Sequence, residues 1–114
     1  MSLNIKVDFD KENNRWIVIP EGEIDIYTSP ELRKKLIKIL SENNTDILID
    51  GEKLEYLDST GLGTLISILK KVRENNNQIY IENIKPNIRK LFHITELDKV
   101  FVIKEWIIWK MILL

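Results

Sequence analysis

LDSTGLGTL, residues 57–65, combines two glycines with hydroxyl side chains where the surrounding pattern predicts the start of an amphipathic helix. Each glycine costs a helix about 1 kcal/mol relative to alanine. Gly61 and Gly63 are half of the four glycines in the chain. Two glycines within one helical turn therefore indicate that this turn has a use other than helix stability.

The residues around these glycines predict a helix tip that displays a serine. Leu57 ends a predicted strand and Asp58 is the predicted N-cap, so Ser59, Thr60 and Gly61 form the first turn. The glycines would let the backbone of another protein approach Ser59 closely. The alternative is a plain cap in which small residues pack against the sheet, and the residues alone leave both open.

Upstream of this turn, the pattern predicts a β-hairpin followed by a helix. NIKVDF (residues 4–9) and RWIVIP (residues 15–20) alternate apolar and polar side chains, and the polar segment between them predicts a turn. The helix has Ser29 as its predicted N-cap and Pro30 as its first residue. Its apolar stripe consists of Leu32, Leu36, Ile39 and Leu40, and basic side chains fill the opposite face.

Downstream, strands and helices alternate. DILID (residues 46–50) and QIYIENI (residues 78–84) read as strands, a short helix starts at Pro86, and VFVI (residues 100–103) reads as a last strand. The helix after Asp58 has an apolar stripe of Leu62, Leu65, Ile66, Leu69 and Val72. This alternation predicts parallel strands joined by right-handed crossovers, with the helices packed on the sheet.

Length and composition limit the class of protein. A chain of 114 residues forms one domain, residues 1–114, with a core that needs no disulfide. The absence of cysteine excludes thiolate metal sites and cysteine nucleophiles. A net charge of −1 and the lack of a long basic run argue against a nucleic acid partner. We see no secretory leader and expect a cytoplasmic protein.

The hydroxyl of Ser59 does not fit a catalytic pattern. A nucleophile elbow needs glycine two residues before the serine, where this chain has Leu57. The only histidine, His93, lies in an apolar-spaced segment and is expected to be a packed or surface residue. The segment also lacks the Gly-Lys-Ser/Thr ending of a phosphate-binding loop. We expect no enzyme activity, no cofactor and no metal.

Three segments of the chain resemble the STAS domains of bacterial anti-sigma factor antagonists. They are EGEID (21–25) followed by Thr28 and Leu32, EYLDSTGLGTL (55–65), and IKPNIRKLFHITELDKVFVI (84–103). The resemblance spans about residues 3–104, and Asp-Ser-Thr-Gly-Leu-Gly is its most specific part. It implies an α/β fold: a single STAS-type domain with a mixed four- to five-stranded β-sheet, an N-terminal hairpin strand and about four helices packed mainly on one face.

The resemblance also implies a function. In this family a serine kinase, which is itself the anti-sigma factor, phosphorylates the serine after the aspartate, here Ser59, and a serine phosphatase reverses the modification. Asp25 is expected to contact the kinase, although it could instead cap its loop. The expected partner-binding residues are Glu23, Asp25, Asp58, Ser59, Thr60, Gly61, Leu62 and Gly63.

The last ten residues, EWIIWKMILL (105–114), depart from the family, whose members usually end in an amphipathic helix with a clear polar side. Eight of the ten are apolar, and they include two of the three tryptophans. Ten residues are too few to span a bilayer as a helix, which takes about 20. The segment is either a terminal helix packed over the sheet, with Trp106 and Ile107 partly buried, or an exposed patch that forms a homodimer or binds a partner.

Two functions from different classes follow from these features. The intact motif favours a regulatory binding module that captures an anti-sigma factor and frees a sigma factor. The alternative is a non-catalytic STAS subunit of a membrane lipid transporter, for which the apolar C-terminus is the supporting feature.

Overall fold

The chain begins with a long antiparallel hairpin, β1 (Leu3–Asp10) and β2 (Arg15–Ile24), in the computed structural model, which describes residues 2–104. Asn14 has a positive φ of 49° in the turn, a conformation that asparagine tolerates better than most residues. The predicted hairpin is confirmed. The predictions for residues 105–114 lie outside the described residues.

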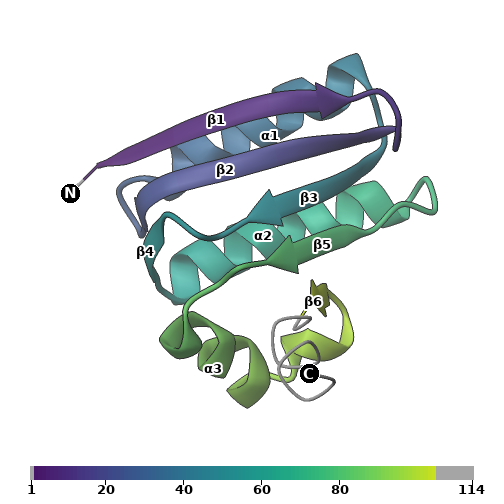
Figure 1. Cartoon of the computed structure of the whole chain (residues 1–114). Helices are drawn as coiled ribbons and strands as arrows, with labels where there is room; N and C mark the ends of the chain where they lie inside the picture. Colours follow the sequence, from purple (N-terminus) through teal and green to yellow (C-terminus); the bar gives the residue numbers. More distant parts are fainter. Residues whose placement is uncertain (1, 105–114) are drawn as a thin grey trace, which may run out of the picture.

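The sheet is mixed, and β2 pairs with more strands than any other strand of the sheet. Its order is β1-β2-β3-β5-β6, with β3 (Asp46–Asp50), β5 (Ile79–Glu82) and β6 (Val102–Lys104), and every pair except β1-β2 is parallel (Figure 1). A further short strand, β4 (Leu54–Leu57), pairs with the far end of β2. The predicted α/β fold is confirmed, with six strands instead of four or five because β4 is a separate strand.

β2 pairs with β3 over its first residues and with β4 near its end, and the pairing with β4 begins at a glycine. The register between β2 and β4 shifts between Gly22 and Glu23, and Gly22 has a φ of 117°. A side chain at Gly22 would collide with the backbone carbonyl oxygen of Ser2. Glycine at this position therefore permits both the bulge and the close approach of the N-terminal strand.

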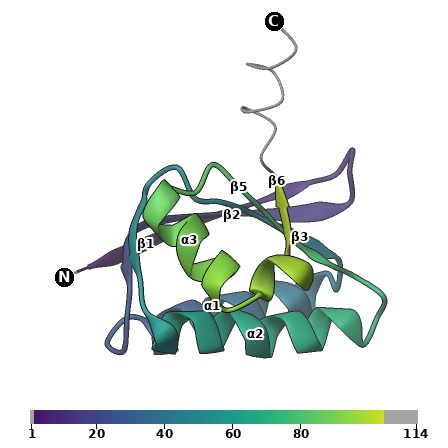
Figure 2. The ribbon, with the colours of Figure 1, turned by 90° about the horizontal axis from the view of Figure 1, so that it is seen from below.

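The helices lie mainly on one face of the sheet. α1 (Ser29–Glu42) and α2 (Ser59–Arg73) pack side by side behind the strands, and Arg33 donates a hydrogen bond of 2.6 Å to the Ser67 hydroxyl between them. Figure 2 shows this helix layer below the strands, with α3 (Pro86–Ile94) at the edge beside β5. A 3-10 turn, Leu97–Lys99, leads into β6. Residues 2–104 thus contain three α-helices of the expected four.

The core lies between the sheet and the helices. Side chains at every second position of the strands meet the apolar stripes of α1 and α2, as the strand and helix periods require. Phe92 of α3 closes one end through an edge-to-face contact with Phe101, at 5.4 Å between ring centroids. The most deeply buried residues include Val18, Leu32, Leu36, Ile47, Ile68, Val72, Ile79, Ile81 and Phe92.

The apolar stripe of α2 differs by one residue from the prediction. Ile68 is 1% exposed and belongs to the core, whereas the predicted Ile66 is only partly buried. Ile68 lies three residues after Leu65 and four before Val72, so all three share one face of the helix. Ile66 lies at the border of that face, where the helix turns toward solvent.

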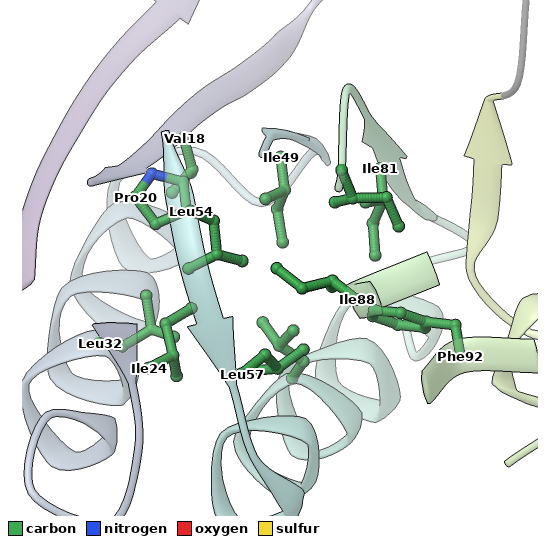
Figure 3. A pocket seen from close by; sticks show the side chains of 12 residues that line it. Val18, Pro20, Ile24, Leu32, Ile49, Leu54, Leu57, Ile81, Ile88 and Phe92 are labelled. Atoms are coloured by element: carbon green, nitrogen blue, oxygen red, sulfur yellow. The ribbon is translucent and has the colours of Figure 1, made fainter. Parts of the chain in front are cut away.

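A small internal space of about 10 Å³ lies in the middle of this core. Figure 3 shows apolar side chains from both layers converging on it, including Ile24, Leu57 and Ile88. A water molecule needs two to four polar partners, and the lining side chains offer none. The space is part of the packed interior and not a ligand site.

We expect Leu36→Ala to lower the free energy of unfolding by about 2–5 kcal/mol, because Leu36 is fully buried and the truncation leaves a cavity. The matched control is Ile94→Ala, because Ile94 is 70% exposed and its truncation should change stability by less than about 0.5 kcal/mol. Urea unfolding followed by circular dichroism measures both. Equal losses in the two variants would contradict the packing described here.

Candidate functional site

Ser59 is the first residue of α2 and is exposed at the tip of the helix. The strand β4 ends at Leu57, and Asp58 caps the helix because its Oδ1 atom accepts a hydrogen bond of 2.9 Å from the Gly61 amide. The Asp58 amide donates to the Ile24 carbonyl oxygen at 3.2 Å, which fixes the start of α2 to the end of β2. The predicted N-cap and the predicted display of the Ser59 hydroxyl are confirmed.

The loop from β2 to α1 is held by the carboxylate of Asp25. Its Oδ1 atom accepts hydrogen bonds from the amides of Tyr27 at 2.9 Å and Thr28 at 3.0 Å. The Thr28 hydroxyl accepts from the Asp25 amide at 2.9 Å and donates to the Glu23 carbonyl oxygen at 2.8 Å. These bonds satisfy backbone groups that the turn would otherwise bury without partners.

Two predictions for this loop change as a result. The N-cap of α1 is Thr28 and not Ser29, whose hydroxyl donates instead to the Asp25 carbonyl oxygen at 2.6 Å. Asp25 is only 3% exposed, so its carboxylate holds the loop, which is the role given above as the alternative to partner contact. Its Oδ2 atom is buried and accepts no hydrogen bond from the described residues.

The parallel pairing of β2 with β4 brings this loop next to Ser59. Glu23 pairs with Tyr56 and Ile24 pairs with Leu57, although the two segments are more than thirty residues apart in the chain. An open hollow of about 300 Å³ lies at the junction. Its lining residues are Glu23, Asp25, Ile26, Tyr27, Tyr56 and Asp58.

Three exposed apolar residues of this hollow are absent from the sequence prediction. Tyr27 is 81% exposed, Ile26 is 61% exposed and Tyr56 is 45% exposed. Ile26 and Tyr27 follow the last residue of β2 and precede the helix, so no strand or helix period assigns them to the core. Their position between two loop anchors, Asp25 and Thr28, was the available signal for a surface role.

The two glycines of the motif have different environments. A Cβ atom at Gly61 would lie 2.6 Å from the Ile24 Cγ2 atom, 2.7 Å from the Leu57 Cδ1 atom and 3.0 Å from the Ile24 carbonyl oxygen. A Cβ atom at Gly63 would meet nothing within 4 Å, and Gly63 is exposed. Gly61 is therefore required for internal packing and not for the approach of a partner, while Gly63 lies on the open surface.

The remaining predicted residues divide between surface and core. Thr60 is exposed beside Ser59, Glu23 and Asp58 are partly buried, and Leu62 is a core residue with 5% exposure. Only the exposed and partly buried residues can contact a partner without a change in the fold. The other members of the predicted set, Gly61 and Leu62, support the helix tip from inside.

His93 is a surface residue of α3, and its Nδ1 atom lies 2.7 Å from the Oδ2 atom of Asp98. No hydrogen bond joins it to Ser59. Within residues 2–104, no group of three or more histidine, aspartate or glutamate side chains is placed to hold a metal ion. The helices in this part of the chain are also too short or too polar to cross a membrane.

Known proteins share both the sequence and the fold. Residues 6–108 match the STAS domain family. The chain is 32% identical over 103 residues to an anti-sigma-B factor antagonist of Staphylococcus aureus, a match that covers 90% of this chain and 95% of that protein. It is 37% identical over 98 residues to the anti-sigma-B factor antagonist of Bacillus subtilis, covering 86% of this chain and 89% of that one.

A solved structure supports the same relationship. The fold matches the crystal structure of an anti-sigma factor antagonist from Mycobacterium paratuberculosis with a TM-score of 0.77 and 27% identity. The match covers 91% of this chain and 86% of that chain. The similarity therefore extends over nearly all of both molecules.

We expect the two glycines to respond in opposite ways to alanine. Gly61→Ala should destabilise the fold by about 1–3 kcal/mol, because the new methyl group would overlap the backbone and side chain of Ile24. Gly63→Ala should stabilise it by up to about 1 kcal/mol, because alanine favours the helix and the space is open. Guanidinium unfolding measures both, and a destabilised Gly63→Ala variant would refute this assignment.

Proposed function

This chain belongs to the STAS domain family, and we propose that its unphosphorylated form binds an anti-sigma factor and thereby releases a sigma factor for transcription. The observation that carries the proposal is the exposed Ser59 hydroxyl on the capped first turn of α2. The names of the relatives support the regulatory role, since the matches cover most of each protein. In this proposal the chain is the substrate of a serine kinase and a serine phosphatase.

The binding surface proposed here surrounds Ser59. Tyr27, Ile26 and Tyr56 present apolar area next to the helix tip, and the partly buried Glu23 and Asp58 add acidic groups at its border. Tyrosine is enriched among the residues that carry most of the energy at protein interfaces. Such a surface suits a partner with an apolar centre and a neutral or basic border.

Phosphorylation of Ser59 would change the charge of this surface and not the fold. A phosphate adds a charge of about −1.5 to −2 at pH 7. The N-terminus of a helix favours that charge, because its first amides point outward and carry partial positive charge. The helix should therefore persist, while the partner meets a cluster of anionic groups formed with Asp58 and Glu23 and is repelled.

The first test is phosphorylation by a candidate anti-sigma factor kinase with ATP, followed by mass spectrometry and measurement of complex formation. We expect the phosphate on Ser59 and at least about tenfold weaker binding, which corresponds to 1.4 kcal/mol of repulsion. Ser59→Ala should bind normally and resist modification. Thr60→Ala is the matched control, because Thr60 is the neighbouring exposed hydroxyl, and it should still be phosphorylated.

Two results would contradict this proposal. If Ser59→Asp or the phosphorylated protein binds as tightly as the unmodified protein, the charge does not control docking. If an active kinase leaves Ser59 unmodified, the role of a STAS subunit in a membrane transporter becomes the better explanation.

A second test concerns the apolar part of the surface. Tyr27→Ala should weaken binding to the anti-sigma factor by about tenfold or more, as expected for a central aromatic contact. It should leave the free energy of unfolding within about 0.5 kcal/mol, because the side chain is 81% exposed. Isothermal calorimetry measures the binding, with Ile94→Ala as the control on another surface. Unchanged affinity for Tyr27→Ala would place the interface elsewhere.

A further inference from the structure

The outer edge of β1 is unpaired in the part of the chain that the structure describes. β1 is the first strand in the order of the sheet, and its one partner within residues 2–104 is β2. Figure 1 shows β1 at the rim of the sheet, with α1 behind the strands. An edge strand presents backbone N–H and C=O groups that can pair with another strand. β1 is eight residues long and contains neither proline nor glycine, so its edge can take part in such pairing.

The side chains of β1 alternate between two different faces. Every second side chain is apolar and partly buried against the core on the helix face, namely Ile5, Val7 and Phe9. The side chains between them are polar and lie on the opposite face, where Lys6 and Asp8 are exposed. A further strand at this edge would therefore meet a regular apolar face and a regular charged face.

The charges of β1 determine how a second copy of the strand can pair antiparallel to it. In a two-fold dimer of this kind, the residue on the axis lies opposite its own copy. With Lys6 or Asp8 on the axis, two like charges would lie directly opposite each other, which destabilises the pairing. With Val7 on the axis, Lys6 lies opposite Asp8 of the second copy, and Asp8 lies opposite Lys6. Alignment on Val7 thus forms two pairs of opposite charge.

The same alignment joins apolar side chains on the helix face. It places Ile5 opposite Phe9 of the second copy and Val7 opposite its own copy. Pairs of aromatic and β-branched side chains across strands are stabilising. These side chains are only partly buried in one molecule, so a second strand would cover more of their apolar surface.

The basic side chains of α1 limit the strength of this contact. Lys34, Lys35 and Lys38 line a hollow of about 240 Å³ beside Asn4 and Ile5. The two-fold axis places the α1 helices of both copies on the same side of the joined sheet, so these lysines repel each other. Lys34 and Lys38 are exposed and can turn toward water, where salt screens their charges. We therefore expect a reversible dimer.

We propose that two copies of this chain pair antiparallel through the outer edges of their β1 strands, aligned on Val7, and form one continuous sheet. Backbone hydrogen bonds hold the two strands together, and the two ion pairs between Lys6 and Asp8 set the register. The partner is a second copy because the edge is complementary to itself in this alignment. The contact uses none of the residues around Ser59, so it holds or fails independently of the proposed function.

Sedimentation equilibrium of the full chain, from micromolar to millimolar protein, tests the contact. We expect a dimer whose fraction rises with concentration. Lys6→Asp should weaken it by at least about tenfold, which corresponds to 1.4 kcal/mol, because two attractions become two repulsions. Combining Lys6→Asp with Asp8→Lys exchanges the two charges and should restore the affinity. Lys90→Glu is the matched control, because Lys90 is exposed on α3, and it should leave the dimer unchanged.

A single introduced cysteine tests the alignment, because the chain has no cysteine of its own. In the proposed dimer the two Val7 Cα atoms lie about 4.5–5.5 Å apart, which is within the range of a disulfide. Val7→Cys should therefore cross-link on mild oxidation, as measured by electrophoresis without reductant. Lys6→Cys is the control, because its two Cα atoms would lie about 8 Å apart, which is beyond that range.

Several results would overturn the proposal. One is a protein that remains a monomer at millimolar concentration. Another is a dimer that Lys6→Asp does not weaken or that the exchanged charges do not restore, because such a dimer uses a different surface. A third is cross-linking of Lys6→Cys as readily as Val7→Cys. Circular dichroism of each variant checks the fold, which we expect to be unchanged because Lys6 and Asp8 are exposed.

Discussion

The close contact between the start of α2 and the end of β2 is the constraint on which the site depends. Gly61 lies so near Ile24 that a single methyl group would overlap it, and the Asp58 amide donates to the Ile24 carbonyl oxygen. The helix tip therefore has one position relative to the β2 loop. That position sets Asp58, the residue before Ser59, at the same hollow as Tyr27 and Tyr56.

The Asp-Ser-Thr-Gly-Leu-Gly motif divides its residues between the interior and the surface. Asp58 caps the helix, Gly61 leaves room for Ile24 against the helix backbone, and Leu62 is buried in the core. Ser59 and Gly63 face solvent, where a modification or a partner can reach them. A charge added at Ser59 thus acts on a turn that is already fixed from inside. This division lets one short motif serve both the fold and the surface at which we propose that a partner binds.

The sequence predicted most of the fold because strand alternation, helix stripes and capping residues are local signals. The hairpin, the position of α2 and the cap at Asp58 all follow from such patterns. The cap of α1 was predicted wrongly and the role of Gly61 was left open, because both depend on contacts across the chain. Ile24 restricts the glycine, and the Asp25 carboxylate makes Thr28 the cap in place of Ser29. The exposed Tyr27 carries no periodic signal at all.

The pairings of β2 with three different strands also place different demands on folding. This strand pairs with β1 through a short turn, but its pairs with β3 and β4 require an intervening helix to be brought into place. Closing such long loops costs entropy before any contact repays it, so topologies of this kind fold more slowly than helical bundles of equal size. Because the hairpin closes the shortest loop, we expect it to form first, and the surface around Ser59 requires β4 to pair with β2 as well.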